Sequence, residues 1–162
     1  METQLTPASS LSHLYDRDYY LWLNQTAKLV REHRLSELDI PHLVEELEDM
    51  GRSEKRAVES NLVVVLMHLL KYQYQPQKRS NSWKVTIREH RRRLRKLFQN
   101  SPSLKPYFEE VFLECYQDAR EQACDETGLP RETFPTESPF TPEEAIDRDY
   151  LPNGDDETSD DW

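Results

Sequence analysis

The chain has 162 residues, with 21 Lys and Arg against 31 Asp and Glu, which gives a formal net charge of −10 at pH 7. Its length favours one domain that buries a core without disulfides or metal, and its acidity argues against a general DNA coat, which needs surplus positive charge. No apolar run approaches the ~20 residues that span a bilayer, so no membrane segment is expected.

Residues 1–13 are polar and mixed in composition, and we expect them to form a flexible arm. The first predicted helix covers about residues 16–32, because its apolar side chains recur every three or four positions along one face. An aspartate at its start, Asp16 or Asp18, is expected to accept the free N–H groups of the first turn.

A second helix is expected to begin at Pro41, whose missing N–H costs nothing in a first turn, with Asp39 as its cap. Its apolar stripe keeps one phase as far as Leu69, so one long helix and a helical hairpin both fit. Gly51 favours a break or kink, because glycine in a helix interior costs about 1 kcal/mol. The helix should end before Pro76, which disfavours a helical conformation in the preceding residue.

A third helix is predicted over residues 82–99 and a fourth over residues 106–127, with Gly128 well placed as its stop. Prolines then punctuate residues 129–152, where a capping-box pattern at 141–144 predicts one short helix.

No strand pattern occurs, so the predicted fold class is all-α. We expect a single domain with four to five longer helices in a bundle and an irregular, proline-rich C-terminal segment. The helical core would cover residues 14–128, and residues 129–152 would wrap around it. Residues 153–162 hold five acids among ten positions and should form a disordered acidic tail.

Several stretches together carry a family resemblance. They include Val44–Gly51 (VEELEDMG), Leu66–Pro76 (LMHLLKYQYQP), Ser101–Lys105 (SPSLK) and Glu126–Pro130 (ETGLP). In this combination, residues 14–152 resemble an uncharacterised bacterial family, common in cyanobacteria, that is numbered 29 among the domains of unknown function. The resemblance implies an all-helical fold and supplies no activity, cofactor or site residue.

Acidic residues gather near the start of the second helix, at Glu45, Glu46, Glu48 and Asp49. Glu45 shares a side of the helix with Glu48 and Asp49, and His42 lies one turn before it. Stacked carboxylates have raised pKa values and can bind divalent cations. Glu45 and Glu48 are therefore candidate catalytic groups, and His42, Glu45 and Asp49 are candidate metal ligands. The alternative is a solvated face or a set of salt-bridge partners, because no Glu-x-x-His motif of the di-iron kind occurs.

His68 is the third catalytic candidate, as a base whose pKa is lowered by burial. In a straight helix it would lie about 30 Å from Glu48, so a site shared with the acids requires the chain to reverse near Gly51. The alternative is a hydrogen-bonded core histidine. Lys71 and Tyr74 follow at one-turn intervals and are candidate binding residues.

Residues 78–96 contain nine Lys and Arg and one Glu, whereas the other 143 residues carry 12 basic and 30 acidic side chains. The candidate binding residues of this segment are Lys84, Arg88, Arg91, Arg92 and Arg95. They form a positive stripe on the third helix that suits phosphates or carboxylates. Trp83 would stack a base if exposed, but it shares a face with core residues, so its burial is expected. Internal neutralisation of the stripe by other acids of the chain is the alternative.

These patterns favour a non-catalytic helical binding or adaptor protein that contacts an acidic partner, a protein or a nucleic acid, through residues 78–96 and without a cofactor. The alternative is a metal-dependent enzyme that acts on nucleic acid or phosphates with the acidic cluster. No Gly-rich phosphate loop, G-x-S-x-G or H-E-x-x-H motif occurs. The first residues lack the features of a signal peptide and cysteines are few, so a cytoplasmic location is expected. The sequence does not indicate an oligomeric state.

Overall fold

The structure of the protein, a computed structural model, describes residues 7–152. These residues form α-helices and short 3₁₀ turns without any strand, which confirms the all-α prediction. The predicted acidic tail, 153–162, lies outside the described residues. None of the helices in the described part is both long enough and apolar enough to cross a membrane.

The helices follow one another with short connections. Their bounds are α1 Pro7–Arg17, α2 Tyr19–Arg31, α3 Ile40–Tyr74, α4 Asn81–Asn100, α5 Leu104–Thr127 and α6 Pro142–Ile146. Single 3₁₀ turns, η1 Leu35–Glu37, η2 Pro76–Lys78 and η3 Arg131–Thr133, lie in the connections.

The N-terminal region holds one more helix than the sequence predicts. Residues 7–13, which were expected in a flexible arm, belong to α1. Asp18 separates α1 from α2, and its carboxylate accepts the backbone N–H of Leu21 at 3.0 Å, as the predicted cap does. Leu11 of α1 is 3% exposed, so the burial of a leucine anchors this helix.

The expected break at Gly51 is wrong, because α3 is helical from Ile40 to Tyr74 without interruption. Gly51 is exposed and no heavy atom lies within 4 Å of the position that a Cβ would take. One glycine costs about 1 kcal/mol in a helix interior. The helix continues through Gly51 because the helical residues on both sides of it, in a helix of 35 residues, outweigh this cost.

The other helix ends follow their local sequence. Ser80 caps α4 by accepting the N–H of Trp83 at 3.3 Å, and Thr141 caps α6 by accepting the N–H of Glu144 at 3.1 Å. Gly128 ends α5 with φ 69°, in the left-handed region that glycine adopts without steric cost.

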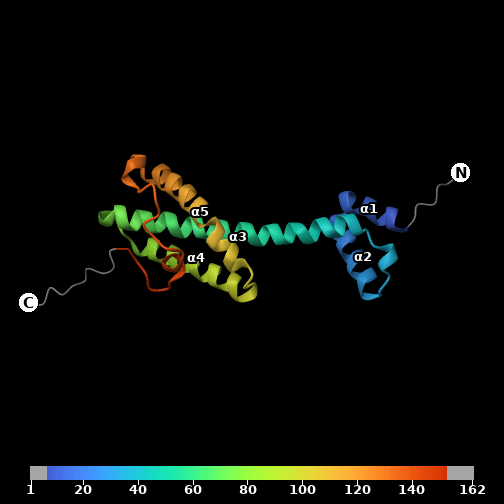
Figure 1. Cartoon of the computed structure of the whole chain (residues 1–162). Helices are drawn as coiled ribbons and strands as arrows, with labels where there is room; N and C mark the ends of the chain where they lie inside the picture. Colours follow the sequence, from blue (N-terminus) through green and yellow to red (C-terminus); the bar gives the residue numbers. More distant parts are fainter. Residues whose placement is uncertain (1–6, 153–162) are drawn as a thin grey trace, which may run out of the picture. The chain divides into compact units, whose positions relative to one another are not determined.

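By contacts the chain divides into two compact units, residues 1–53 and residues 54–162, which we call unit 1 and unit 2. Within unit 1, α1 and α2 lie beside the beginning of α3 (Figure 1). Its buried apolar side chains in the described part are Leu11, Trp22 and Leu38. The Trp22 indole N–H donates to the buried carboxylate of Asp39 at 3.1 Å, which ties α2 to the start of α3.

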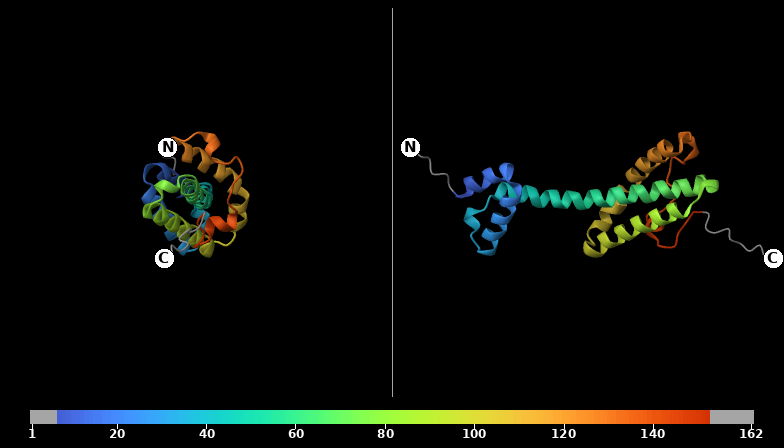
Figure 2. Two further views of the ribbon diagram at one scale, coloured as in Figure 1. Left: turned by 90° about the vertical axis from the view of Figure 1, so that its left-hand side faces the viewer. Right: turned by 180° about the vertical axis from the view of Figure 1, so that it is seen from behind.

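Unit 2 holds the main core. The second half of α3 lies between α4 and α5, and the chain after α5 returns along α4 (Figures 1 and 2). The buried faces of these helices share one apolar cluster, which includes Leu62, Leu66, Ile87, Leu94 and Phe108. The nearly all-apolar run at 62–70 is mostly buried, as predicted, because it packs in this cluster with α4 and α5.

Candidate functional site

A buried arginine holds the proline-rich segment against α4. The Arg91 guanidinium donates to the backbone oxygens of Ala145 at 3.0 Å, Glu144 at 2.9 Å and Tyr150 at 2.7 Å. Only 2% of Arg91 is exposed, and its burial lowers the pKa to about 10. The prediction that Arg91 contacts a partner is therefore wrong: its donors already satisfy the C-terminal carbonyls of α6.

A second buried arginine, Arg120 on α5, has the same role at the start of this segment. Its guanidinium donates to the carbonyls of Phe134 at 3.0 Å and Arg131 at 3.1 Å, and the Tyr116 hydroxyl donates to the carbonyl of Pro135. Sequence reasoning missed both arginines as tethers. The signal was present in the spacing, because Arg91 falls between Ile87 and Leu94 on the apolar stripe of α4.

Most of the remaining basic segment is also occupied inside unit 2. Arg92 and Arg93 both pair with Glu89, at 2.8 and 3.2 Å. Arg95 is half-buried and its guanidinium lies 3.4 Å from the carbonyl oxygen of Ile146. Arg79 donates to the carbonyl of Tyr72 at 2.7 Å and stacks on its ring. These arginines are therefore held by Glu89, an acid of the same segment, and by backbone carbonyls; within the described residues, no ion pair joins them to another acid of unit 2 as the alternative expected.

Three cations of α4 keep open side chains. Lys84, Arg88 and Lys96 are exposed, and none has an ion-pair partner within residues 7–152. Lys84 also lines a small hollow of about 360 Å³ with Arg79 and Ser80, at the N-terminal end of α4. This end of α4 combines two cations with the positive end of a helix dipole.

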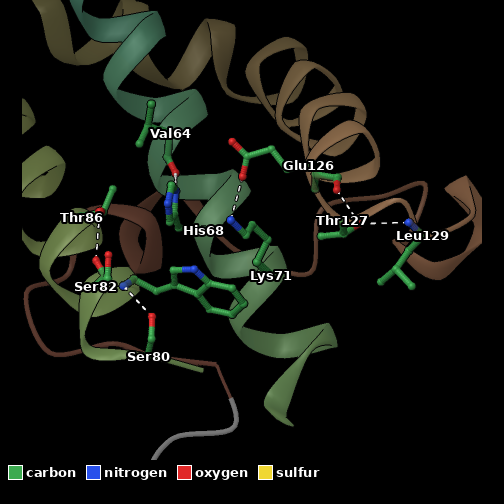
Figure 3. Close-up of polar contacts among 11 residues, drawn as sticks. Val64, His68, Lys71, Ser80, Ser82, Thr86, Glu126, Thr127 and Leu129 are labelled. Carbon is green, nitrogen blue, oxygen red and sulfur yellow. Dashed lines mark hydrogen bonds and ion pairs between the residues drawn. The ribbon is translucent and has the colours of Figure 1, made fainter. Parts of the chain in front are cut away.

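Lys71 lies in a cluster where α3, α4 and α5 meet (Figure 3). Its Nζ is 2.7 Å from the carboxylate of Glu126 and 4.8 Å from the centroid of the Trp83 ring. Only 12% of the Lys71 side chain is exposed. The prediction of Lys71 as a partner-binding residue is not supported, because its ammonium already has an anion and an aromatic face. Trp83 is half-buried, and Lys71 covers one face of its ring.

His68 also faces this cluster (Figure 3), and its Nδ1 lies 2.9 Å from the carbonyl oxygen of Val64. Burial, with a smaller effect from Lys71, lowers the pKa of His68 below its usual value. The ring of His90 is 2.8 Å from the side-chain oxygen of Asn61, and burial lowers its pKa as well. Both contacts fit the alternative of hydrogen-bonded core histidines. Tyr74 packs edge-to-face on Phe134 and is half-buried, so it also serves packing.

The acidic cluster of unit 1 is distributed among local partners. Glu46 accepts the hydroxyls of Tyr15 and Tyr19, which raises the pKa of both phenols. Asp49 and, more weakly, Glu48 pair with Arg52. His42 stacks on Tyr15 with 4.0 Å between ring centroids and contacts the carboxylate of Asp39.

These contacts leave the metal hypothesis without an assembled site. No group of three or more His, Cys, Asp and Glu side chains within the described part of the chain is arranged to hold a metal ion. The acids were to share a site with His68 only if the chain reversed near Gly51, and α3 passes Gly51 as a helix. Glu45 itself is exposed.

A further pocket of unit 2, of about 800 Å³, lies between α5 and the proline-rich segment. Its lining includes Phe112, Leu113, Phe140 and the carboxylates of Glu109 and Glu137. None of the candidate site residues lines this pocket.

Both cysteines are free, and Cys115 is buried. Burial raises the pKa of the Cys115 thiol to about 12, as is typical of a cysteine that packs in a core.

Comparison with known proteins gives one relationship. No curated protein and no solved structure matches the chain significantly. A family model described as "Domain of unknown function DUF29" matches residues 14–151, which include most of both units. This agrees with the resemblance noted in the sequence and with the all-α fold. The chain therefore belongs to the DUF29 family.

Proposed function

We propose that this protein is a non-catalytic binding protein whose α4 contacts an acidic partner. The observation that carries the proposal is the row Lys84, Arg88, Arg92 and Lys96, which recurs every fourth residue on the outer face of α4. Arg91, on the inner face, holds the proline-rich segment. The row therefore projects from a helix that is fixed on its other side, so little ordering cost is expected on binding.

The chemistry of this surface favours an acidic protein segment over a nucleic acid. Single-stranded nucleic acids are held by aromatic platforms as well as by cations, and Trp83 is covered by Lys71. Carboxylates of a protein segment need only cations and N–H donors. The hollow beside Lys84 offers one carboxylate an open cation at the positive end of the α4 dipole. We also propose that the protein is bacterial and is located in the cytoplasm.

The test compares two triple variants with the same change of charge. Lys84→Glu/Arg88→Glu/Lys96→Glu reverses the open cations of α4, and Arg56→Glu/Lys105→Glu/Arg148→Glu reverses three exposed cations elsewhere in unit 2. Binding of a fluorescein-labelled, glutamate-rich peptide and of a single-stranded RNA is measured by anisotropy at about 50 mM and about 300 mM salt.

We expect the natural chain to bind the acidic peptide at low salt, and the α4 variant to bind it at least about tenfold more weakly than the control variant. Equal losses in the two variants would contradict the assignment to α4. RNA binding without peptide binding would replace the acidic protein with a nucleic acid as partner.

A further inference from the structure

Unit 1 carries most of the exposed large apolar side chains of the described chain. Within the part of the chain that the structure describes, ten of the twelve exposed large apolar side chains lie between Tyr19 and Met50. Among the residues of the unit whose burial is described, the buried apolar side chains are Leu11, Trp22 and Leu38. Small units bury a low fraction of their surface and depend on oligomerisation or other cross-links for stability.

Apolar side chains of unit 1, most of them exposed, are organised as two matching stripes. On α2 the stripe is Leu23, Ala27 and Val30, and on the first half of α3 it is Leu43, Leu47 and Met50. Each stripe has the i, i+4, i+7 spacing of one helical face. Together they line an open groove of about 710 Å³ that lies wholly within unit 1. Leu47 is 59% exposed and Met50 is 65% exposed, so no part of the described unit covers them.

The two walls of this groove carry opposite charge. α2 contains Lys28 and Arg31 and no acidic residue. Residues 40–53 contain four acids, Glu45, Glu46, Glu48 and Asp49, and one basic residue, Arg52. Helical spacing places Arg31 directly beside the α2 stripe, on its outer side, and Glu48 farther round α3, on the outer side of its stripe. The outer sides of the two helices thus carry opposite charges.

We propose that a second copy of this chain covers the groove, in a two-fold association in which α2 of each copy lies along the first half of α3 of the other. The six stripe residues of each copy then bury one another as in a bundle built from two helical hairpins. Because a two-fold interface is self-complementary, Arg31 of one copy faces Glu48 of the other, and the reciprocal pair forms at the same time. Unit 1 of each copy therefore carries both the apolar side chains and the charges that are complementary to the groove of the other copy.

The first experiment measures the mass of the full chain by analytical ultracentrifugation. We expect a dimer for the natural chain and a monomer for Leu47→Glu. Leu113→Glu, at a leucine of α5 that is 68% exposed, is the matched control and should remain dimeric. A natural chain that is monomeric at about 100 μM, or a Leu47→Glu variant that stays dimeric, overturns the proposal.

The second experiment uses charge and leaves every apolar contact in place. Arg31→Glu alone and Glu48→Arg alone each create two like-charge contacts across the two-fold axis, so each variant should dimerise at least about tenfold more weakly. An equal mixture of the two variants restores both opposite-charge contacts and should form a mixed dimer of natural affinity. A mixture that associates no better than the separate variants overturns the two-fold arrangement. The mixture would also fail to associate if a different protein, and not a second copy, covers the groove.

Discussion

At the scale of single residues, two basic side chains of this protein hold one segment of the chain against its helices. Arg91 and Arg120 are charged, yet they lie on the apolar faces of α4 and α5 and donate to backbone carbonyls of the segment after α5. That segment has few backbone partners of its own, because its prolines prevent a continuous helix. A guanidinium can satisfy several carbonyls at once, since it carries five donors in a rigid plane.

Arg91→Met should destabilise the protein by about 3 kcal/mol, because the carbonyls of Glu144, Ala145 and Tyr150 lose their donor in a buried setting. Urea unfolding followed by circular dichroism measures the change. Arg92→Met, at an exposed position paired with Glu89, is the control and should cost less than about 0.5 kcal/mol. Arg91→Lys should recover little of the loss, because one ammonium cannot reach three carbonyls. Similar costs for Arg91→Met and Arg92→Met would contradict the tether role.

The half-buried histidines of unit 2, His68 and His90, predict a pH dependence of stability. Burial lowers the pKa of His68 and of His90 in the folded state, so between the lowered values and about 6.5 the unfolded chain binds more protons. The free energy of unfolding should therefore fall as pH is lowered through this window, and it should be independent of these groups above it. Urea unfolding at pH 7.5 and pH 5.5 tests this, and His68→Gln should reduce the difference. An unchanged difference in that variant would exclude His68 as a cause.

At the scale of elements, helix ends follow local sequence closely, whereas the continuity of α3 does not. The caps Asp18, Ser80 and Thr141 and the stop at Gly128 act within one turn, so local spacing is enough to predict them. Gly51 has only a small local preference against helix, and the helix on both sides of it prevails.

Alanine substitutions at Gly51, within α3, and at Gly128, directly after α5, should change the free energy of unfolding in opposite directions. Gly51→Ala should stabilise the protein by about 1 kcal/mol, because Gly51 is helical and a Cβ meets no atom within 4 Å. A Cβ at position 128 also meets open space, but alanine is strained at the φ of 69° found there. Gly128→Ala should therefore lower the free energy of unfolding by about 1 kcal/mol. Chemical unfolding of both variants checks the pair, and a stabilising Gly128→Ala would refute the backbone argument.

At the scale of the whole molecule, unit 1 and unit 2 differ in what they bury. Unit 2 encloses the main apolar cluster, whereas the described part of unit 1 has three buried apolar side chains and a polar network around Asp39 and Glu46. If a second copy completes unit 1, only the stability of unit 1 should depend on concentration.

Thermal unfolding tests this difference with Trp22 as a reporter. In a Trp83→Phe/Trp162→Phe variant, fluorescence reports unit 1 alone, and its midpoint should rise by about 5 °C for each tenfold increase in concentration. The remaining change in circular dichroism, from unit 2, should keep its midpoint. Concentration-independent fluorescence would count against association through unit 1.

The candidate site was less predictable than the helices. Charge at Arg91, Lys71 and Lys84 is visible in the sequence, but their roles depend on distant partners: Ala145 for Arg91, Glu126 for Lys71, and solvent for Lys84. The same limit applies to the acidic cluster, where the tyrosines of α1 and α2 bind Glu46 from about thirty residues away. Spacing along one helix defines which residues share a face, but not what lies opposite that face.

The sequence by itself determined the all-α class, most helix ends and the concentration of positive charge at residues 78–96, because each depends on neighbours within a turn or two. Tertiary structure alone decided which of those charges are open. It buried Arg91, covered Lys71 and left Lys84, Arg88 and Lys96 exposed. It also left the stripes of α2 and α3 uncovered, since burial depends on the packing of segments that are distant along the chain.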